Sequence, residues 1–153
     1  MILVSACLAG VKCRYDGRAK TDPAVRLLVA EKKAMPFCPD LLGGRRVPRN
    51  SVEIVGGTGA DVLAGRARVK DKEGNDVTEE TLAGVKEFIK TLHALNAEAV
   101  ILKTKSPVCG FGEIYDGTFT GTLIEGNGVL GAALAMENIV IYTEYNIAEL
   151  LKK

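Results

Sequence analysis

Short apolar runs alternate with segments of helical pattern, and this alternation constrains the fold more than any other feature of the chain. The runs lie at residues 1–6, 34–37, 99–103 and 139–143. Runs of this length with a continuously apolar centre are typical of strands that are buried on both faces. Strands that alternate with helices form a mostly parallel sheet with right-handed crossovers. The sequence therefore predicts an α/β fold.

The helical segments carry recognisable start signals. The segment 22–33 begins with an aspartate followed by a proline, which suit the N-cap and the first helical position. Asp76 or Thr78 is expected to cap the longest helix, and further helices are expected over 126–138 and 146–153. The longest helix is predicted to bury one apolar stripe, which consists of Leu82, Val85, Ile89, Leu92 and Leu95.

The segment 40–65 is rich in glycine, proline and arginine, and it favours loops over regular structure. A strand is expected at 52–55, and the segment 66–76 predicts a hairpin that turns at 73–75. The motif GGTGAD at 56–61 matches one unit of the calcium-binding β-roll repeat. A single unit has no neighbour with which to share an ion, so we interpret this motif as a glycine turn.

Length and charge limit the classes of protein that fit. A chain of 153 residues predicts one domain over 1–153. Its 20 lysines and arginines against 19 acidic residues leave a net charge of +1, which provides no field for a nucleic-acid polymer. The apolar runs are shorter than the roughly 20 residues of a membrane span. The first residues carry no basic leader, so a reducing, cytoplasmic location is expected.

The four cysteines are the most informative residues, because a reducing compartment favours metal ligands, redox thiols or core residues over disulfides. Cys7 and Cys38 each follow a predicted strand, and Cys109 lies in the loop after another. The carboxyl ends of parallel strands share one edge of a sheet, where ligand crevices form. We therefore expect these three cysteines to converge, whereas Cys13 lies apart in a polar loop.

Three convergent cysteines resemble an iron–sulfur site with one open iron more than a closed tetrahedral zinc site. The sequence lacks the paired CxxC spacing of zinc ribbons and ferredoxins. The residues alone therefore leave three alternatives open. They are an iron–sulfur protein, a zinc or thiol protein without sulfur chemistry, and a small nucleotide-binding module whose cysteines are structural.

Several motifs in a fixed order resemble a bacterial family long catalogued as a domain of unknown function, which includes the thiouracil desulfidases. The resemblance extends from about residue 2 to residue 144. The motifs are SACLAG at 5–10, CRYDG at 13–17, CPD at 38–40, GGTG at 56–59, KTKSPVCG at 103–110 and YDGTF at 115–119.

The resemblance implies a Rossmann-like, three-layer domain that holds a [4Fe-4S] cluster by three cysteines. By position these ligands would be Cys7, Cys38 and Cys109, and Cys13 is left out. The fourth iron would be free to take sulfur from a thiolated pyrimidine, with release of sulfide. The implied partner is therefore a small molecule, with no nucleic-acid polymer and no membrane.

The resemblance also implies two catalytic residues, and the chemistry of nearby basic and aromatic side chains adds a set of substrate-binding candidates. A carboxylate next to the second cysteine is Asp40 here, where relatives usually carry glutamate, and Ser106 matches a serine three positions before the last cysteine. Asp40 could instead cap a turn, and Ser106 could start one. Arginine offers a planar fork to an anion and aromatic rings can stack on a pyrimidine. The substrate-binding candidates are Arg14, Tyr15, Lys103 and Tyr115, with Phe119 as a further aromatic.

Overall fold

A computed structural model describes residues 1–152, and it contains the expected parallel sheet. Four strands pair in the order β2-β1-β5-β8, and every pair is parallel. The predicted α/β class with a mostly parallel sheet is confirmed. The strands are β1 (Ile2–Ser5), β2 (Ala34–Phe37), β5 (Ala99–Leu102) and β8 (Val140–Thr143).

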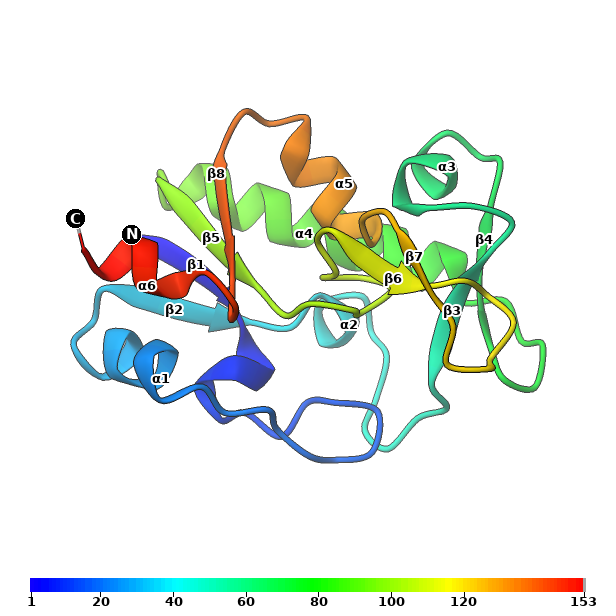
Figure 1. The fold of residues 1–153 in the computed structure, drawn as a ribbon, viewed down its shortest axis with the longest axis horizontal. Coiled ribbons are helices and arrows are strands. Elements are labelled where there is room, and N and C mark those ends of the chain that lie inside the picture. Colours follow the sequence, from blue (N-terminus) through cyan, green and yellow to red (C-terminus); the bar gives the residue numbers. More distant parts are fainter. Residues whose placement is uncertain (153) are drawn as a thin grey trace.

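Helices cover both faces of this sheet, which gives three layers (Figure 1). Leu3, Val100 and Leu102 pack in the apolar cluster that contains α4 and α5. Their neighbours Val4 and Ile101 point to the other face and pack with α1 and α6, because successive strand residues alternate between faces. The helices are α1 (Pro23–Ala30), α4 (Thr78–Ala94), α5 (Val129–Ala135) and α6 (Ile147–Leu151).

The strand order creates a crevice at one edge of the sheet. From β1 the chain crosses first to β2 on one side, and it later returns to place β5 on the other side. This reversal is a topological switch point, where loops diverge and ligands bind beyond the carboxyl ends of the strands. A 3-10 helix η1 (Ala6–Ala9) follows β1, and the short helix α2 (Pro39–Leu42) follows β2 at this edge.

Two small antiparallel ladders stand beside the main sheet (Figure 1). The predicted strand at 52–55 is confirmed, but the predicted hairpin at 66–76 is only partly formed. Its first arm pairs with β3, and its second arm retains one bridge, between Lys70 and Asp76. Asp76 instead accepts hydrogen bonds from the backbone N–H of Thr78 and from Arg68. The second arm of the predicted hairpin therefore leads into the first turn of α4 rather than forming a full strand. The ladders are β3 (Val52–Val55) with β4 (Arg68–Asp71), and β6 (Glu113–Tyr115) with β7 (Leu123–Glu125).

The helix start signals are confirmed at α1, where Asp22 Oδ1 accepts from the backbone N–H groups of Ala24 and Val25. Of the apolar stripe predicted for α4, Val85 and Leu92 are buried and the other members are only partly buried. Phe88 is fully buried, whereas Ile89 lies only partly in the core. The reason is that α4 packs against both α2 and α5, so its buried face is wider than one stripe. Of the predicted helix over 146–153, residue 153 lies outside the described residues.

The GGTGAD motif forms a turn and the start of another helix, α3 (Gly59–Leu63). Thr58 and Asp61 form a capping box at its first turn. Gly59 packs so closely on the loop before α5 that a Cβ would collide with the carbonyl group of Gly128. The interpretation as a glycine turn is therefore explained by a close backbone approach.

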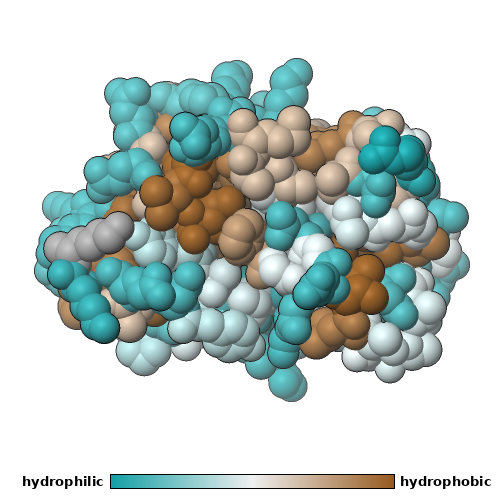
Figure 2. Space-filling model, turned by 45° about the horizontal axis from the view of Figure 1, so that its top comes forward, coloured by the Kyte–Doolittle hydropathy of each residue, from teal (hydrophilic) through white to brown (hydrophobic). Residues whose placement is uncertain are grey.

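The surface over α5 and β8 gathers hydrophobic residues (Figure 2). Met136 is 79% exposed after α5, and Val140 is 51% exposed at the first position of β8. Because Val140 begins its strand, this patch lies toward the amino end of the strand and away from the crevice. No described helix is both long enough and apolar enough to cross a membrane.

Candidate active site

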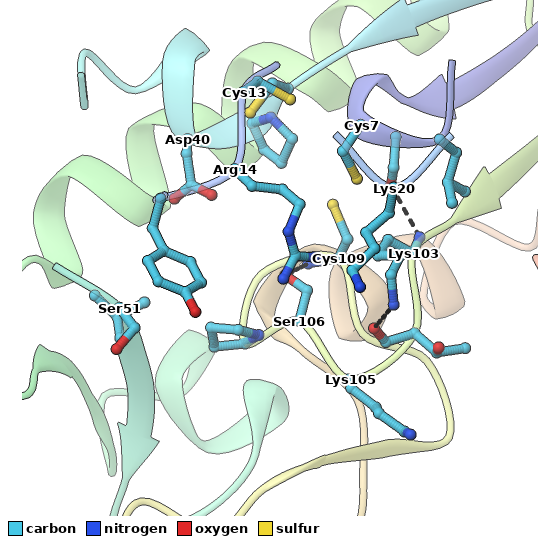
Figure 3. Close-up of a pocket in the computed structure, with 18 of the residues that line it drawn as sticks. Cys7, Cys13, Arg14, Lys20, Asp40, Ser51, Lys103, Lys105, Ser106 and Cys109 are labelled. Atoms are coloured by element: carbon cyan, nitrogen blue, oxygen red, sulfur yellow. Dashed lines mark hydrogen bonds between the residues drawn. The ribbon is translucent and has the colours of Figure 1, made fainter. Parts of the chain in front are cut away.

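A cavity of about 1150 Å³ opens at the carboxyl ends of the parallel strands, and it collects the three cysteines that the sequence places after strands. Cys7 lies on η1 after β1, and Cys38 is the N-cap residue of α2 after β2. Cys109 lies in the loop that follows β5. All three line the cavity, so the predicted convergence at one crevice is confirmed (Figure 3 labels Cys7 and Cys109).

Cys13 joins the other cysteines, which the sequence did not indicate. It lines the same cavity and is only 3% exposed, although Lys12 and Arg14 flank it. The loop folds back over η1, where the backbone N–H of Lys20 donates to the Cys7 carbonyl oxygen at 3.0 Å. This long-range contact leaves no local pattern in the sequence, so only the motif CRYDG itself could have drawn attention to Cys13.

Hydrogen bonds link three of the thiols and shift their acidity. The Cys13 side chain hydrogen-bonds to those of Cys7 and Cys38, which lowers the pKa of Cys7 and lowers the pKa of Cys38 to about 7. The same hydrogen bonds raise the pKa of Cys13, so it is the thiol that keeps its proton. Burial raises the pKa of Cys109. The group thus combines two acidic thiols, one protonated thiol and one desolvated thiol.

The donor set fits an iron–sulfur cluster. Thiolates are the ligands of such clusters, and hydrogen bonds to sulfur are part of their surroundings. The backbone N–H of Leu41 hydrogen-bonds to the Cys38 side chain, and the positive charges of Arg14 and Lys103 favour thiolate at Cys7. Within residues 1–152 no group of three or more His, Cys, Asp or Glu side chains is placed to hold a single metal ion. The sulfur atoms line a cavity instead.

Asp40 lies in the first turn of α2 and is held by two arginines. Its Oδ1 is 3.5 Å from Arg45 and its Oδ2 is 3.2 Å from Arg49, and all three side chains are at most 16% exposed. The carboxylate does not cap α2, whose N-cap residue makes no side-chain capping hydrogen bond. The alternative of a simple capping aspartate is therefore not what the structure shows.

Ser106 holds the turn that carries Cys109. Its Oγ accepts from the backbone N–H groups of Val108, at 3.2 Å, and Cys109, at 3.1 Å. The alternative that this serine starts a turn is therefore correct. Both hydrogen bonds use the oxygen as acceptor, so the hydroxyl proton is still available to a molecule in the cavity.

The four substrate-binding candidates all line the cavity. Arg14 extends into it (Figure 3), its Nε is buried with no hydrogen-bond partner among the described residues, and its guanidinium lies 5.9 Å from the ring centroid of Tyr15. Lys103 is less free, because its Nζ is 2.9 Å from Glu144 Oε2 and also donates to the Thr104 carbonyl oxygen. Arg14 is therefore the cation best placed to meet a ligand.

Acidic residues that the sequence reasoning missed also line the cavity. Glu144 follows β8 and pairs with Lys103, and Glu53 lies on β3. Neither belongs to a motif or follows a cysteine, so no local pattern pointed to them. Against four acidic side chains, the described cavity wall carries seven basic ones, which are Arg14, Lys20, Arg45, Arg49, Lys72, Lys103 and Lys105.

The fold and the site together define a class of protein. It is a Rossmann-like α/β protein whose switch-point crevice is lined by thiols and basic groups and is suited to an iron–sulfur centre.

Comparisons with known proteins assign the chain to a particular family. Residues 2–146 match the protein family described as 2-thiouracil desulfurase. The chain is 46% identical over 151 residues to the uncharacterized protein YbbK of Bacillus subtilis (strain 168), across 99% of this chain and 100% of that protein. The solved structure of the [4Fe-4S]-dependent thiouracil desulfidase TudS is 35% identical, with a TM-score of 0.86 over 98% of this chain and 94% of that chain. The chain belongs to the 2-thiouracil desulfurase family.

Proposed function

We propose that this protein is a [4Fe-4S]-dependent desulfidase that removes sulfur from a thiolated pyrimidine and releases sulfide. The observation that carries the proposal is the delivery of Cys7, Cys38 and Cys109 to one cavity by three different segments of the fold. Family membership and the likeness to TudS support the same chemistry.

Cys7, Cys38 and Cys109 would hold the cluster, and Cys13 would stay beside it as a hydrogen-bonding thiol. When bound, the cluster supplies a metal that prefers the soft sulfur of a thiocarbonyl group over the hard oxygen of uracil. This preference accounts for the selection of the group to be removed.

Asp40 would take a proton from the water that attacks the thiocarbonyl carbon. It lies two residues after Cys38, which keeps the carboxylate close to the thiols. Arg45 and Arg49 hold its two oxygens in place, so the carboxylate is preorganised. Ser106 would donate its free hydroxyl proton to the substrate or to the water, because its lone pairs are already engaged by backbone N–H groups.

Arg14 would bind a carbonyl oxygen or an anionic group of the substrate, and the basic excess of the cavity would favour an anionic ligand. Tyr15, Tyr115 and Lys103 complete the proposed binding surface. The partner is then a small molecule rather than a nucleic-acid polymer or a membrane. We further propose that residues 1–153 act as one domain in the cytoplasm, where thiol ligands stay reduced.

The proposal is tested by anaerobic reconstitution followed by assays of iron, sulfide and turnover with a thiouracil. We expect Asp40→Asn to keep the brown cluster and to lose roughly 100- to 10,000-fold in turnover, the usual effect of losing a general acid or base. Asp40→Glu should maintain or raise turnover, and Glu87→Gln, on the exposed face of α4, is the matched control.

Two results would overturn the proposal. A reconstituted parent that releases no sulfide from any thiolated pyrimidine would end the desulfidase assignment, and a colourless protein that binds zinc would favour the alternative of a zinc or thiol protein. If Asp40→Asn turned over as fast as the parent, the carboxylate would be structural, and another residue would have to move the proton.

A further inference from the structure

One buried carboxylate anchors the turn between β6 and β7. The backbone N–H groups of Gly117 and Phe119 both donate to Glu53 Oε1, at 2.9 and 3.2 Å. Glu53 is 8% exposed and belongs to β3, in a different ladder from the turn. Because hydrogen bonds to a carboxylate are stronger than those between neutral groups, Glu53 fixes the turn against β3.

Close packing and internal hydrogen bonds make the turn rigid. Gly117 approaches β3 so closely that a Cβ would collide with the carbonyl oxygen of Ile54. Within the turn, the backbone N–H of Thr118 donates to Asp116 Oδ1 at 3.0 Å, and the hydroxyls of Thr118 and Thr120 are 2.6 Å apart. The turn therefore presents its residues in one arrangement.

Phe119 occupies an unfavourable backbone conformation inside this rigid turn. Its φ is +59°, in the left-handed region that glycine and asparagine adopt far more readily than a bulky residue. A strained residue persists only where its surroundings hold it, and such residues concentrate at ligand sites. Here Glu53 holds the backbone N–H of the strained residue itself.

The strained residue lines the same cavity as the thiols. Tyr15, Tyr115 and Tyr145 line it too, so Phe119 is one of four aromatic residues in a wall that also carries thiols and many charged groups. An aromatic face binds a planar heterocycle by stacking, whatever hydrogen-bonding groups that heterocycle carries on its edges.

We propose that Phe119 is the residue on which the heterocyclic ring of the substrate stacks, and that Glu53 is the positioning residue that holds it there. The proposal rests on the proposed function, because it assigns the substrate class as planar thiolated bases and excludes non-planar thio-compounds.

The main experiment removes the aromatic ring of Phe119 and at the same time relieves the strain of its left-handed backbone conformation. In the cluster-loaded enzyme, Phe119→Asn should raise the KM for thiouracil roughly 10-fold, the size of one base–aromatic stacking interaction, with a much smaller change in kcat. Asparagine tolerates the left-handed conformation, so the thermal midpoint should stay close to that of the parent. Phe119→Tyr, which keeps the ring, should restore the KM.

A second experiment reads stacking directly, without sulfur removal. The chain contains no tryptophan, so Phe119→Trp introduces a single fluorophore. Titration of the cluster-loaded variant with uracil should quench its emission with saturation. The control is Leu27→Trp, because Leu27 lies on α1 outside the cavity and is 59% exposed. Its emission should not respond to uracil.

Two variants of Glu53 test its positioning role. Glu53→Ala removes the acceptor and should raise the KM as Phe119→Asn does, whereas Glu53→Gln keeps one carbonyl acceptor and should recover most of the affinity. A structural role alone would instead lower the thermal midpoint of both variants and leave the KM unchanged.

The results separate this inference from the proposed function. The stacking role is overturned if Phe119→Asn releases sulfide with an unchanged KM, or if Phe119→Trp releases sulfide but shows no quenching. Either result leaves the assignment as a desulfidase intact. Saturable quenching by uracil in a protein that releases no sulfide supports stacking and overturns the desulfidase.

Discussion

At the scale of single residues, the site is organised around the contrast between Cys13 and the other thiols. Cys13 lies between Cys7 and Cys38 and hydrogen-bonds to both. Its raised pKa makes it the donor in these bonds, whereas thiolates are the species that ligate metals. That Cys13 is not a ligand stays a prediction, and the structure adds hydrogen bonds of Cys13 that the sequence did not indicate.

Serine substitution of each cysteine tests whether Cys7, Cys38 and Cys109 are ligands and Cys13 is not. We expect Cys7→Ser, Cys38→Ser and Cys109→Ser to abolish retention of iron after anaerobic reconstitution, because each removes one of three proposed thiolate ligands. Cys13→Ser should keep nearly all of the iron, since a hydroxyl can still donate to the neighbouring thiolates. Iron and acid-labile sulfide per chain are the measurements. Equal loss in Cys13→Ser would contradict the assignment of three ligands.

At the scale of elements, the contact between α2 and α4 sets the position of the segment that carries Cys38 and Asp40. The short helix α2 carries Asp40 and begins at Cys38, so its placement decides where both groups lie. Glycines stand on both sides of the contact. A Cβ on Gly84 of α4 would collide with the Pro39 carbonyl oxygen, and a Cβ on Gly43 would collide with the Glu80 carbonyl oxygen.

Adding one methyl group at this contact should disturb stability and the site together. We expect Gly84→Ala to lower the free energy of unfolding by about 2 kcal/mol, a usual cost of overpacking, even though alanine favours helix. It should also reduce iron retention, because α2 must shift with Cys38. Urea denaturation and iron content measure the two effects. The exposed substitution Lys86→Ala in the same helix is the control, and a Gly84→Ala protein with parental stability would show that α2 is not held by this contact.

At the scale of the whole molecule, the cavity forms where the main sheet meets the two ladders. The thiols come from the loops and helices that follow strands of the sheet, whereas Glu53, Tyr115 and Phe119 come from the ladders and the turn between β6 and β7. The basic excess also belongs to the cavity wall rather than to the chain, whose net charge is +1. An anionic ligand would therefore meet a local field that composition does not reveal.

Carboxylates distributed over the ladders should make the fold sensitive to acid. The side chain of Asn75 is the first cause that lowers the pKa of Asp71 to about 2, and the Arg68 side chain lowers that of Asp76. These folded-state values lie below the unfolded value of about 3.9, so the unfolded chain binds protons first. The stabilisation is present above about pH 4 and is lost as the pH falls toward about 2.

The measurement is the thermal midpoint of the cluster-free protein between about pH 6 and about pH 3. We expect the midpoint to fall steadily below about pH 4. In Asn75→Ala, which removes the first cause of the shift at Asp71, the midpoint should start lower and fall less over this range, because the folded and unfolded pKa values of Asp71 lie closer together. A midpoint that is flat across this range would contradict the assignment of these aspartates as stabilising.

The sequence by itself determined the α/β alternation, the start of α1 at Asp22 and the three cysteines that follow strands, because these depend on local periodicity and on the shared edge of a parallel sheet. The ordered motifs also identified the family correctly. Only the tertiary structure decided that Cys13 lies against Cys7 and Cys38, that β4 pairs with β3 and that Glu53 holds Phe119. The physical reason is that the geometry of these contacts depends on how loops, strands and turns pack in the whole molecule rather than on any local pattern.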